Sequence, residues 1–178
     1  SPALLTSLRD YAGVPGRVGV ALAMRRLEDP SIAAFLTDAD PLIVAEAARA
    51  INDLPIEAAQ PALAAIAGNE GLEDAVLRRA MNAAYRIGTA EDAAIIAKIA
   101  ADSNREDSIR LVAAEMLATW NTPSKLDTVN GRWRPLANRE VDGLQNAISS
   151  FLPGMLAGSE QLRQKTITIA TALGVTDM

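Results

Sequence analysis

The chain contains no histidine and no cysteine among its 178 residues, and these two absences exclude much of enzyme chemistry. Catalytic triads, histidine-based acid–base catalysis and nearly all zinc or haem sites need one or both of these side chains. Disulfides cannot form, so cysteine usage says nothing about the redox compartment. Catalysis would have to rest on Asp, Glu, Lys, Ser or Tyr alone.

Aromatic residues are also scarce: they make up 3% of the chain, although 49% of its residues are hydrophobic. Core packing must therefore come from Ala, Leu, Ile and Val. This composition favours thin layers of closely packed helices over a β-sandwich, which needs β-branched and aromatic strands. At this length we expect one domain with a substantial core.

A basic excess is missing as well. The net charge is −5, and the fourteen arginines are spread along the chain beside acidic residues. This predicts solvated helix faces of mixed charge rather than a nucleic-acid surface. No segment approaches the roughly 20 apolar residues of a membrane span, so we expect no membrane insertion.

The chain starts Ser1-Pro2-Ala3-Leu4-Leu5, without an initiator methionine. The start has neither the basic region nor the long apolar stretch of a signal peptide. We interpret it either as the result of leader removal or as the beginning of a segment cut from a longer chain.

What the sequence does contain is an apolar pattern that occurs four times at the spacing i, i+3, i+4, i+7. This spacing places four side chains on one stripe of a helix. The last positions of successive copies lie 24, 36 and 33 residues apart, in the range of helical solenoids. Alanines at the middle positions let neighbouring helices approach closely. The copies are Val20/Ala23/Met24/Leu27, Val44/Ala47/Ala48/Ile51, Ala80/Ala83/Ala84/Ile87 and Ala113/Met116/Leu117/Trp120.

Start and stop signals divide the chain into helices. Asp29-Pro30 and Asp40-Pro41 each combine a capping carboxylate with a proline that suits the first turn. Thr89 with Asp92 approximates a capping box, and Gly88 fits a left-handed C-cap. The predicted helices cover about 17–28, 31–37, 41–52, 55–67 (or from Pro61), 72–87, 90–101 and 107–120, then a short helix within 123–129, and two more capped by Asn138 and Ser159.

We therefore predict an all-α fold, an α-α superhelix of about five helical pairs in one domain of residues 1–178. Residues 1–13 lead into it, residues 14–131 form four repeats, residues 132–137 are a connector and residues 138–178 form a divergent C-terminal pair. The connector cannot be helical throughout, because Pro135 favours an extended conformation for the preceding residue.

The repeats resemble HEAT repeats of the short kind over about residues 14–123. The resemblance rests on Asp29-Pro30 and Asp40-Pro41 before helices, on Glu46-Ala47-Ala48-Arg49-Ala50-Ile51 within one helix and on Gln60-Pro61-Ala62-Leu63 in the next. It implies a solenoid scaffold.

A narrower resemblance is to the HEAT segment of large exported bacterial proteins. It rests on residues 21–27 and 47–53, on Trp120-Asn121-Thr122-Pro123 with Asp127, and on Gly131-Arg132-Trp133-Arg134-Pro135-Leu136. In that family a sugar-dehydrogenase-like β-propeller precedes the repeats and a c-type cytochrome domain follows them. The resemblance implies an exported or periplasmic location and redox chemistry in other domains, since this chain has no Cys-x-x-Cys-His motif.

The candidate protein-interaction site is Arg132, Trp133 and Arg134. In an extended connector this triplet can present an aromatic face and two guanidinium groups to a carboxylate, a phosphate or a partner loop. Alternatively, Trp133 fills the helical stack beside the short helix of the fourth repeat, and the arginines pair with local acids. We predict no catalytic residue, metal site or cofactor.

Two other charged groups have structural alternatives. Arginines on the first helices of successive pairs can form a ladder for an acidic partner, but we favour pairing with acids of neighbouring repeats. The tight carboxylate groups stand at helix starts, where capping is the favoured interpretation over metal binding. The arginines are Arg25, Arg26, Arg49, Arg78, Arg79 and Arg110; the carboxylates are Asp38, Asp40, Glu70, Glu73 and Asp74.

The predicted function is a non-catalytic helical-repeat scaffold that mediates protein–protein or interdomain interaction within a larger multidomain protein. The alternative is an enzyme on a HEAT-like scaffold, either a DNA-repair glycosylase or a lyase. Such a glycosylase needs a basic concave groove, which the acidic composition argues against. A pigment-binding role is a third possibility, but six aromatic residues supply a tetrapyrrole pocket poorly.

Overall fold

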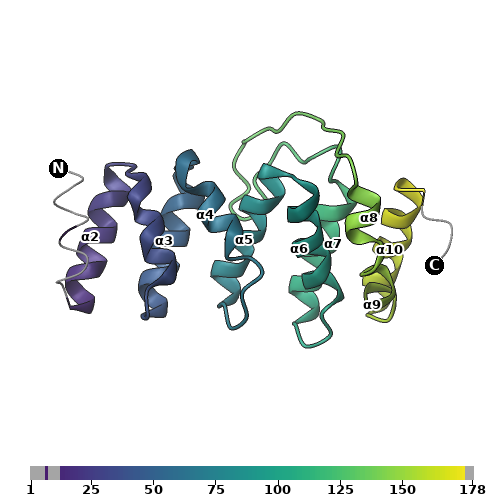
Figure 1. The fold of residues 1–178 in the computed structure, drawn as a ribbon, viewed down its shortest axis with the longest axis horizontal. Coiled ribbons are helices and arrows are strands. Elements are labelled where there is room, and N and C mark those ends of the chain that lie inside the picture. Colours follow the sequence, from purple (N-terminus) through teal and green to yellow (C-terminus); the bar gives the residue numbers. More distant parts are fainter. Residues whose placement is uncertain (1–6, 8–12, 175–178) are drawn as a thin grey trace. The chain divides into compact units, whose positions relative to one another are not determined.

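The computed structural model describes residue 7 and residues 13–174, and most of these residues lie in helices (Figure 1). The polypeptide forms two compact units that divide between Ala83 and Ala84. Within the described residues no β-strand is present, apart from one isolated antiparallel bridge between Leu126 and Trp133. The fold is therefore all-α, as predicted. Among the helices described, none has the length and apolar character needed to cross a membrane.

Two helices of the N-terminal unit begin at the predicted caps, Asp29 and Asp40, whereas the first helix begins at Val14 rather than near Arg17. The side chains of Asp29 and Asp40 accept hydrogen bonds from the backbone N–H groups of Ser31 (3.0 Å) and Leu42 (2.9 Å). Capping is therefore confirmed for both carboxylates. The elements are α2 (Val14–Arg26), the 3₁₀ helix η1 (Pro30–Thr37), α3 (Pro41–Asp53), the 3₁₀ helix η2 (Glu57–Ala59), α4 (Gln60–Ala65) and the first part of α5 (Asp74–Ile87).

Of the two starts predicted for the helix within residues 55–67, Pro55 is wrong and the start near Pro61 is confirmed, since α4 covers Gln60–Ala65. Only α4 is α-helical there, and Pro61 occupies its first turn, where a missing N–H breaks no helical bond. The buried amide of Gln60 donates to the carbonyl oxygen of Ile51 at 2.8 Å, which fixes the start of α4 against α3.

The apolar stripe is mostly buried, but Ala23 and Val44 are half-buried and two of its last positions are exposed. Leu27 and Ile87 are 59% and 41% exposed, so their assignment to the core is wrong. Leu27 follows the last residue of α2, and Ile87 is the last residue of α5, so both lie where the helix ends. Trp120, which holds the same position in the fourth copy, is buried as predicted.

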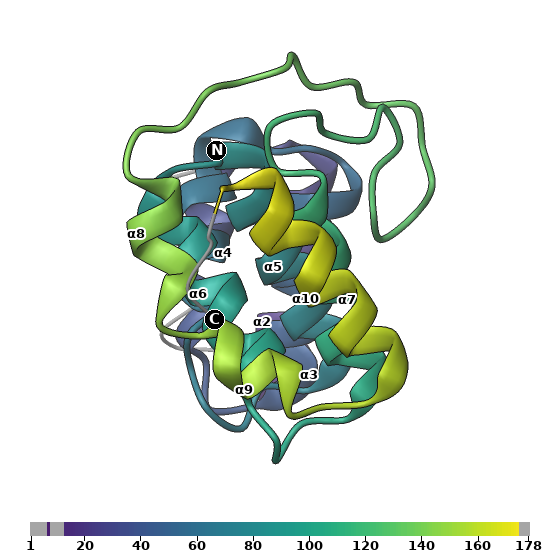
Figure 2. The same cartoon turned by 90° about the vertical axis from the view of Figure 1, so that its right-hand side faces the viewer.

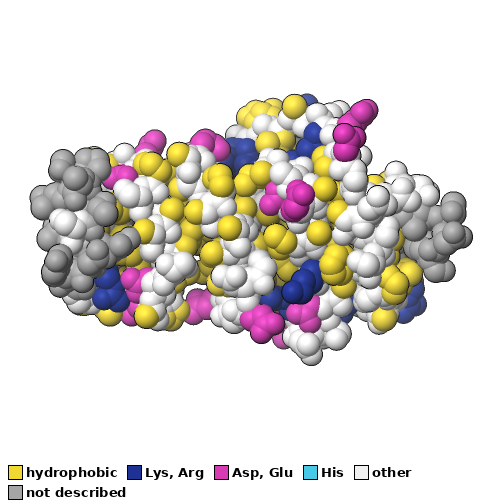
Figure 3. Space-filling model, viewed as in Figure 1, with side chains coloured by type: hydrophobic (Ala, Val, Ile, Leu, Met, Phe, Trp, Pro, Cys, Tyr) yellow, Lys and Arg dark blue, Asp and Glu magenta, His cyan; other side chains and the backbone are white. Residues whose placement is uncertain are grey.

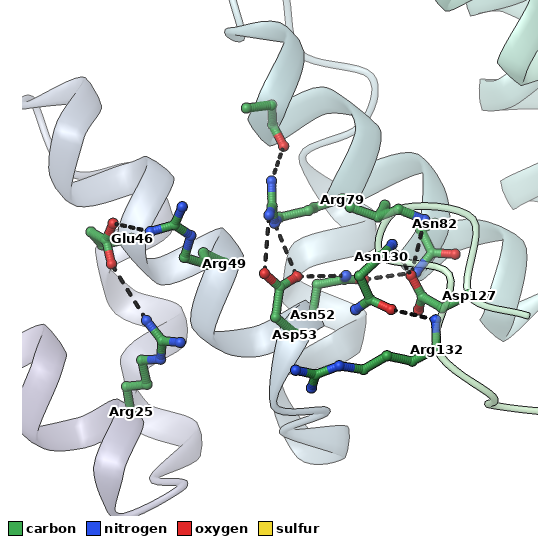
Figure 4. Close-up of polar contacts among 12 residues, drawn as sticks. Arg25, Glu46, Arg49, Asn52, Asp53, Arg79, Asn82, Asp127, Asn130 and Arg132 are labelled. Atoms are coloured by element: carbon green, nitrogen blue, oxygen red, sulfur yellow. Dashed lines mark hydrogen bonds and ion pairs between the residues drawn. The ribbon is translucent and has the colours of Figure 1, made fainter.

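A buried polar chain joins α3 to α5 within the N-terminal unit (Figure 4). Asn82 donates to the side-chain oxygen of Asn52 at 2.7 Å, and Asn52 donates to the carboxylate of Asp53 at 3.0 Å. Arg79 donates two hydrogen bonds to the same carboxylate, from Nε at 3.2 Å and from Nη2 at 3.0 Å. Asn52 and Asn82 are fully buried, so the paired amides satisfy groups that would otherwise be costly to bury.

Three of the arginines on the first helices of successive pairs form ion pairs within the chain. They are Arg25, Arg49 and Arg79. Arg25 and Arg49 both face Glu46, at 3.8 and 3.2 Å, and Arg79 faces Asp53. Pairing with an acid of a neighbouring helix is confirmed for Arg25 and Arg79. Arg110 differs, because its buried guanidinium donates to carbonyl oxygens.

The C-terminal unit packs α6 against α7, α8 and α9, and α10 against α7 and α9 (Figure 2). The predicted capping box is present: Thr89 and Asp92 exchange hydrogen bonds of 3.1 Å at the start of α6. Ser159 caps α10, also as predicted. The elements are α6 (Ala90–Ala101), α7 (Asp107–Ala118), α8 (Leu144–Ser149), α9 (Leu152–Leu156) and α10 (Glu160–Ala172).

Two predicted helix features of this unit are wrong. Residues 123–129 are not helical, and Asn138 does not cap a helix. Instead, a long loop of residues 119–143 joins α7 to α8, which begins only after Gly143 in the left-handed region (φ 76°).

The stability of the fold at acid pH depends on the ionisation of Asp53 within this polar chain. Burial raises the pKa of its carboxyl, but hydrogen bonds from Arg79 and Asn52 and the charges of Arg79 and Arg49 outweigh this, so the pKa lies below its ordinary value. The unfolded chain therefore takes up this proton at higher pH than the folded chain. The stabilisation is complete above the ordinary pKa and is lost as pH falls through the lowered one.

We predict that Asp53→Asn is less stable than wild type at neutral pH and loses less stability below about pH 4. Urea unfolding between pH 7 and pH 2 measures both effects. Glu70→Gln, at an exposed position of the same unit, should follow wild type. Parallel pH profiles for wild type and Asp53→Asn would contradict the role assigned to Asp53.

Candidate functional site

The loop of residues 119–143 contains a short hairpin, residues 125–134, and projects beyond the ends of α7 and α8 (Figure 2). The N–H of Asp127 donates to the carbonyl oxygen of Arg132 at 2.8 Å, and the N–H of Arg134 donates to that of Lys125 at 3.0 Å. Gly131 supplies the left-handed turn residue (φ 68°), and its N–H donates to the carbonyl oxygen of Asp127 at 2.9 Å. The candidate triplet therefore forms one arm of a hydrogen-bonded ribbon.

The buried carboxylate of Asp127 organises this hairpin. One oxygen accepts the backbone N–H groups of Val129 (3.0 Å) and Asn130 (3.1 Å), and the other accepts Nη1 of Arg134 at 3.0 Å. The Asp127 side chain is 0% exposed and that of Arg134 is 11% exposed. An Asp that captures backbone N–H groups two and three residues ahead competes with helix formation. This local competition explains why residues 123–129 are not helical.

Strand alternation separates the three candidate residues. Neighbouring residues of an extended arm point to opposite faces, and cross-strand partners share a face. Trp133 therefore shares a face with its partner Leu126, whereas Arg132 and Arg134 belong to the other face, with Asp127. Because Arg134 is paired with the buried carboxylate of Asp127, the triplet does not offer two available guanidinium groups beside an aromatic ring.

The structural interpretation of the triplet has two parts, one for Trp133 and one for the arginines, and they have different outcomes. Trp133 is 66% exposed, so the idea that it fills the helical stack is wrong. Pairing with a local acid is confirmed for Arg134, whose guanidinium meets Asp127. Arg132 is exposed, and its backbone N–H donates to the side-chain oxygen of Asn130 at 3.0 Å (Figure 4).

The returning part of the loop is fastened by Arg139. Its N–H donates to the carbonyl oxygen of Asn121 at 3.0 Å, and its Nε donates to that of Trp120 at 2.8 Å. The guanidinium carbon lies 4.6 Å from the ring centre of Trp120 and 5.3 Å from that of Tyr85. Burial lowers the pKa of Arg139, while interactions with Tyr85 and Asp92 oppose this change. Arg139, which is partly buried, therefore joins the two ends of the loop.

Arg139 packs against two aromatic side chains of the C-terminal unit, Tyr85 and Trp120. The rings of Tyr85 and Trp120 meet edge to face, with centres 5.5 Å apart and planes at 67°. The Tyr85 hydroxyl bonds to the hydroxyl of Thr119 at 2.8 Å. A second clamp comes from Arg86, whose Nη1 donates to the carbonyl oxygen of Arg134 at 3.1 Å.

A groove of about 360 Å³ lies between α7 and the hairpin. Its apolar wall comes from Val112 and Met116 of α7 and from Leu126 of the hairpin. Thr119, Ser124 and Thr128 add hydroxyl groups, and Glu115 lines one side. Figure 3 shows that the projecting loop carries hydrophobic, basic and acidic side chains close together.

Sequence reasoning predicted a non-helical connector only for residues 132–137, and it missed the roles of Asp127 and Arg139. An available signal for Asp127 was its position before Asn130-Gly131, a typical turn pair. Arg139 gave no such signal, because its partners Tyr85 and Trp120 lie far away in the sequence. Among the residues that the structure describes, no group of three or more acidic side chains is placed to hold a metal ion.

Comparison of the chain with models of known protein families, with curated proteins and with solved structures found no significant match.

A substitution at Gly88 tests how closely the Arg139 side chain packs against this residue. Gly88 has φ 79°, and a Cβ there would lie 1.9 Å from Nη1 of Arg139. We predict that Gly88→Ala costs about 1–2 kcal/mol for backbone strain alone and more for the displaced guanidinium. Gly174→Ala is the matched control, since Gly174 also follows a helix end with φ 68° but has open space around it. Equal losses in thermal unfolding experiments would contradict the seating of Arg139.

Asp127 tests whether one carboxylate holds the hairpin. Asp127→Ala leaves two backbone N–H groups and the guanidinium of Arg134 without this acceptor, and we predict a local loss of about 2–3 kcal/mol. Hydrogen exchange at the amides of Asp127, Gly131 and Arg134 should accelerate by more than tenfold. Asp142→Ala, at an exposed position of the same loop, should leave these rates unchanged. Unaltered exchange in Asp127→Ala would show that the hairpin has another support.

Proposed function

We propose that the chain is a non-catalytic helical-repeat scaffold of the HEAT-like type, whose loop of residues 119–143 presents a protein-binding surface. The observation that carries this proposal is the exposure of Trp133 on a hairpin held by buried hydrogen bonds. Trp and Arg are the residues most often found at the energetic centres of protein interfaces. Binding loops on rigid scaffolds are also a common functional arrangement.

The order of the loop supports a binding role. A flexible Trp-bearing loop would lose conformational entropy on binding, whereas a preorganised one loses little. Asp127, Arg134 and Arg139 hold this loop before any partner arrives. The interaction energy of Trp133 would therefore contribute to affinity rather than to ordering.

The repeat interpretation rests on the apolar stripe and on how its copies pack. Consecutive elements pair within each unit, α3 with η1 and α6 with α7. The buried Asn52–Asn82 hydrogen bond joins the first helices of two successive copies. These features support an α-α superhelix of about five helical pairs, the arrangement that we propose.

The proposed partner is a flanking domain of the same polypeptide or a separate protein. The resemblance to exported bacterial proteins points to a β-propeller before the repeats and a cytochrome domain after them. In that setting the chain would be a periplasmic spacer that positions redox domains without taking part in their chemistry.

The test uses the polypeptide regions that flank this chain in its full-length coding sequence, expressed separately and titrated by calorimetry. We predict that Trp133→Ala weakens binding of a flanking region at least tenfold, because hot-spot truncation costs about 2 kcal/mol or more. Leu42→Ala, at a 57% exposed apolar position of the N-terminal unit, is the control and should bind like wild type.

Two results would overturn the proposal. One is that neither flanking region binds, or that Trp133→Ala binds as tightly as Leu42→Ala. The other is retarded migration of duplex DNA at moderate salt, which would favour the glycosylase alternative.

A further inference from the structure

The groove beside the hairpin has an uneven distribution of charge. Its lining contains two carboxylates, Glu115 and Asp127, and no basic side chain. Asp127 is buried against Arg134, but the Glu115 side chain is 55% exposed. Glu115 is therefore the charged group that a molecule entering from solvent would meet.

The chain itself places an alkylammonium group on this carboxylate. Lys165 of α10 donates from Nζ to Glu115 across the outer side of α7. Both side chains are partly exposed, and exposed ion pairs of this kind contribute little to stability. A competing cation can therefore take the place of Lys165 at small cost.

The wall beside Glu115 suits an aliphatic stem. Val112, Met116 and Leu126 form it, and Leu126 continues onto the exposed ring of Trp133, its cross-strand partner. Long basic side chains lay their methylene groups on apolar surface while the charged end stays near water. The volume of about 360 Å³ lies at the lower end of the range for ligand sites, enough for one such side chain with an apolar neighbour.

We propose that this groove binds a Lys or Arg side chain of a basic, apolar partner segment, with its charged end on Glu115 and its stem between Met116 and Leu126. The inference rests on the proposed protein-binding role of the loop and specifies its partner. The net charge of −5 favours approach of a basic segment, since opposite net charges speed association.

An acidic segment fits this face poorly. Neither Arg132 nor Lys125, whose Nζ lies 5.9 Å from the ring centre of Trp133, is among the residues that line the groove. A carboxylate in the groove would meet Glu115 without a lining cation to offset it.

The test titrates the intact chain with three peptides, Ac-Ala-Leu-Arg-Leu-Ala-NH₂ and its Gln and Glu analogues, at physiological ionic strength. Two-dimensional NMR gives the dissociation constants and maps the contact. The Arg peptide should bind most tightly, shift the amides of Val112, Glu115 and Leu126, and lose about three- to fivefold in affinity in Glu115→Gln. Glu91→Gln, at an exposed carboxylate outside the groove, is the matched control.

Removing Lys165 should change the affinity for the Arg peptide in the opposite direction from Glu115→Gln. Lys165→Ala frees Glu115 and should strengthen binding of the Arg peptide about two- to threefold. Lys98→Ala removes the same charge from an exposed position of α6 and should change affinity less, because salt screens distant charges beyond about 8 Å. Circular dichroism confirms that each of these surface variants keeps its fold.

Equal affinity for the three peptides, preference for the Glu peptide, or equal effects of Lys165→Ala and Lys98→Ala would overturn the inference. If flanking regions still bind through Trp133 in those cases, the scaffold proposal stands and only the partner chemistry is wrong. If the Arg peptide binds as described but Trp133→Ala leaves flanking-region binding intact, the groove stands and the Trp133-centred surface is wrong.

Discussion

The loop that carries Trp133 depends on one buried carboxylate. Asp127 accepts two backbone N–H groups and the Arg134 guanidinium, and these contacts add to the Asn130-Gly131 turn and the backbone hydrogen bonds of the hairpin. The hairpin in turn supplies Leu126 to the groove and sets which face Trp133 occupies. An interaction of three hydrogen bonds thus decides the shape of the surface to which we assign function.

The scarcity of aromatic residues makes their placement informative. Tyr85 and Trp120 are buried together, and they form the seat on which Arg139 fastens the returning loop. Trp133 has no such structural use, since two thirds of its side chain is exposed. In a chain whose core is built mainly from small aliphatic residues, an exposed Trp on an ordered hairpin offers a large apolar contact area to a partner.

Local signals predicted most of the helices, and the errors arose where other hydrogen bonds compete with the expected helix. The bounds of α6 follow from Thr89, Asp92 and an apolar face, all within a few residues of one another. Residues 123–129 had a similar local appearance, with Pro123 at the start and Leu126 and Val129 on one side. The carboxylate of Asp127 competes with that helix, and Arg139 fastens the loop through residues far away in the sequence.

The sequence predicted that residues 132–137 are not helical, but not the roles that these residues have in the hairpin. An Arg-Trp-Arg triplet before a proline indicates an extended segment, yet the function of each arginine depends on what the opposite arm provides. Asp127 lies opposite Arg132 in the hairpin and diagonal to Arg134. Its ion pair with Arg134 gives that guanidinium a structural role. Sequence order alone cannot show this, because the pairing register of the hairpin determines which side chains share a face. The same register places Leu126 beside Trp133, so the binding surface is a product of pairing rather than of the triplet itself.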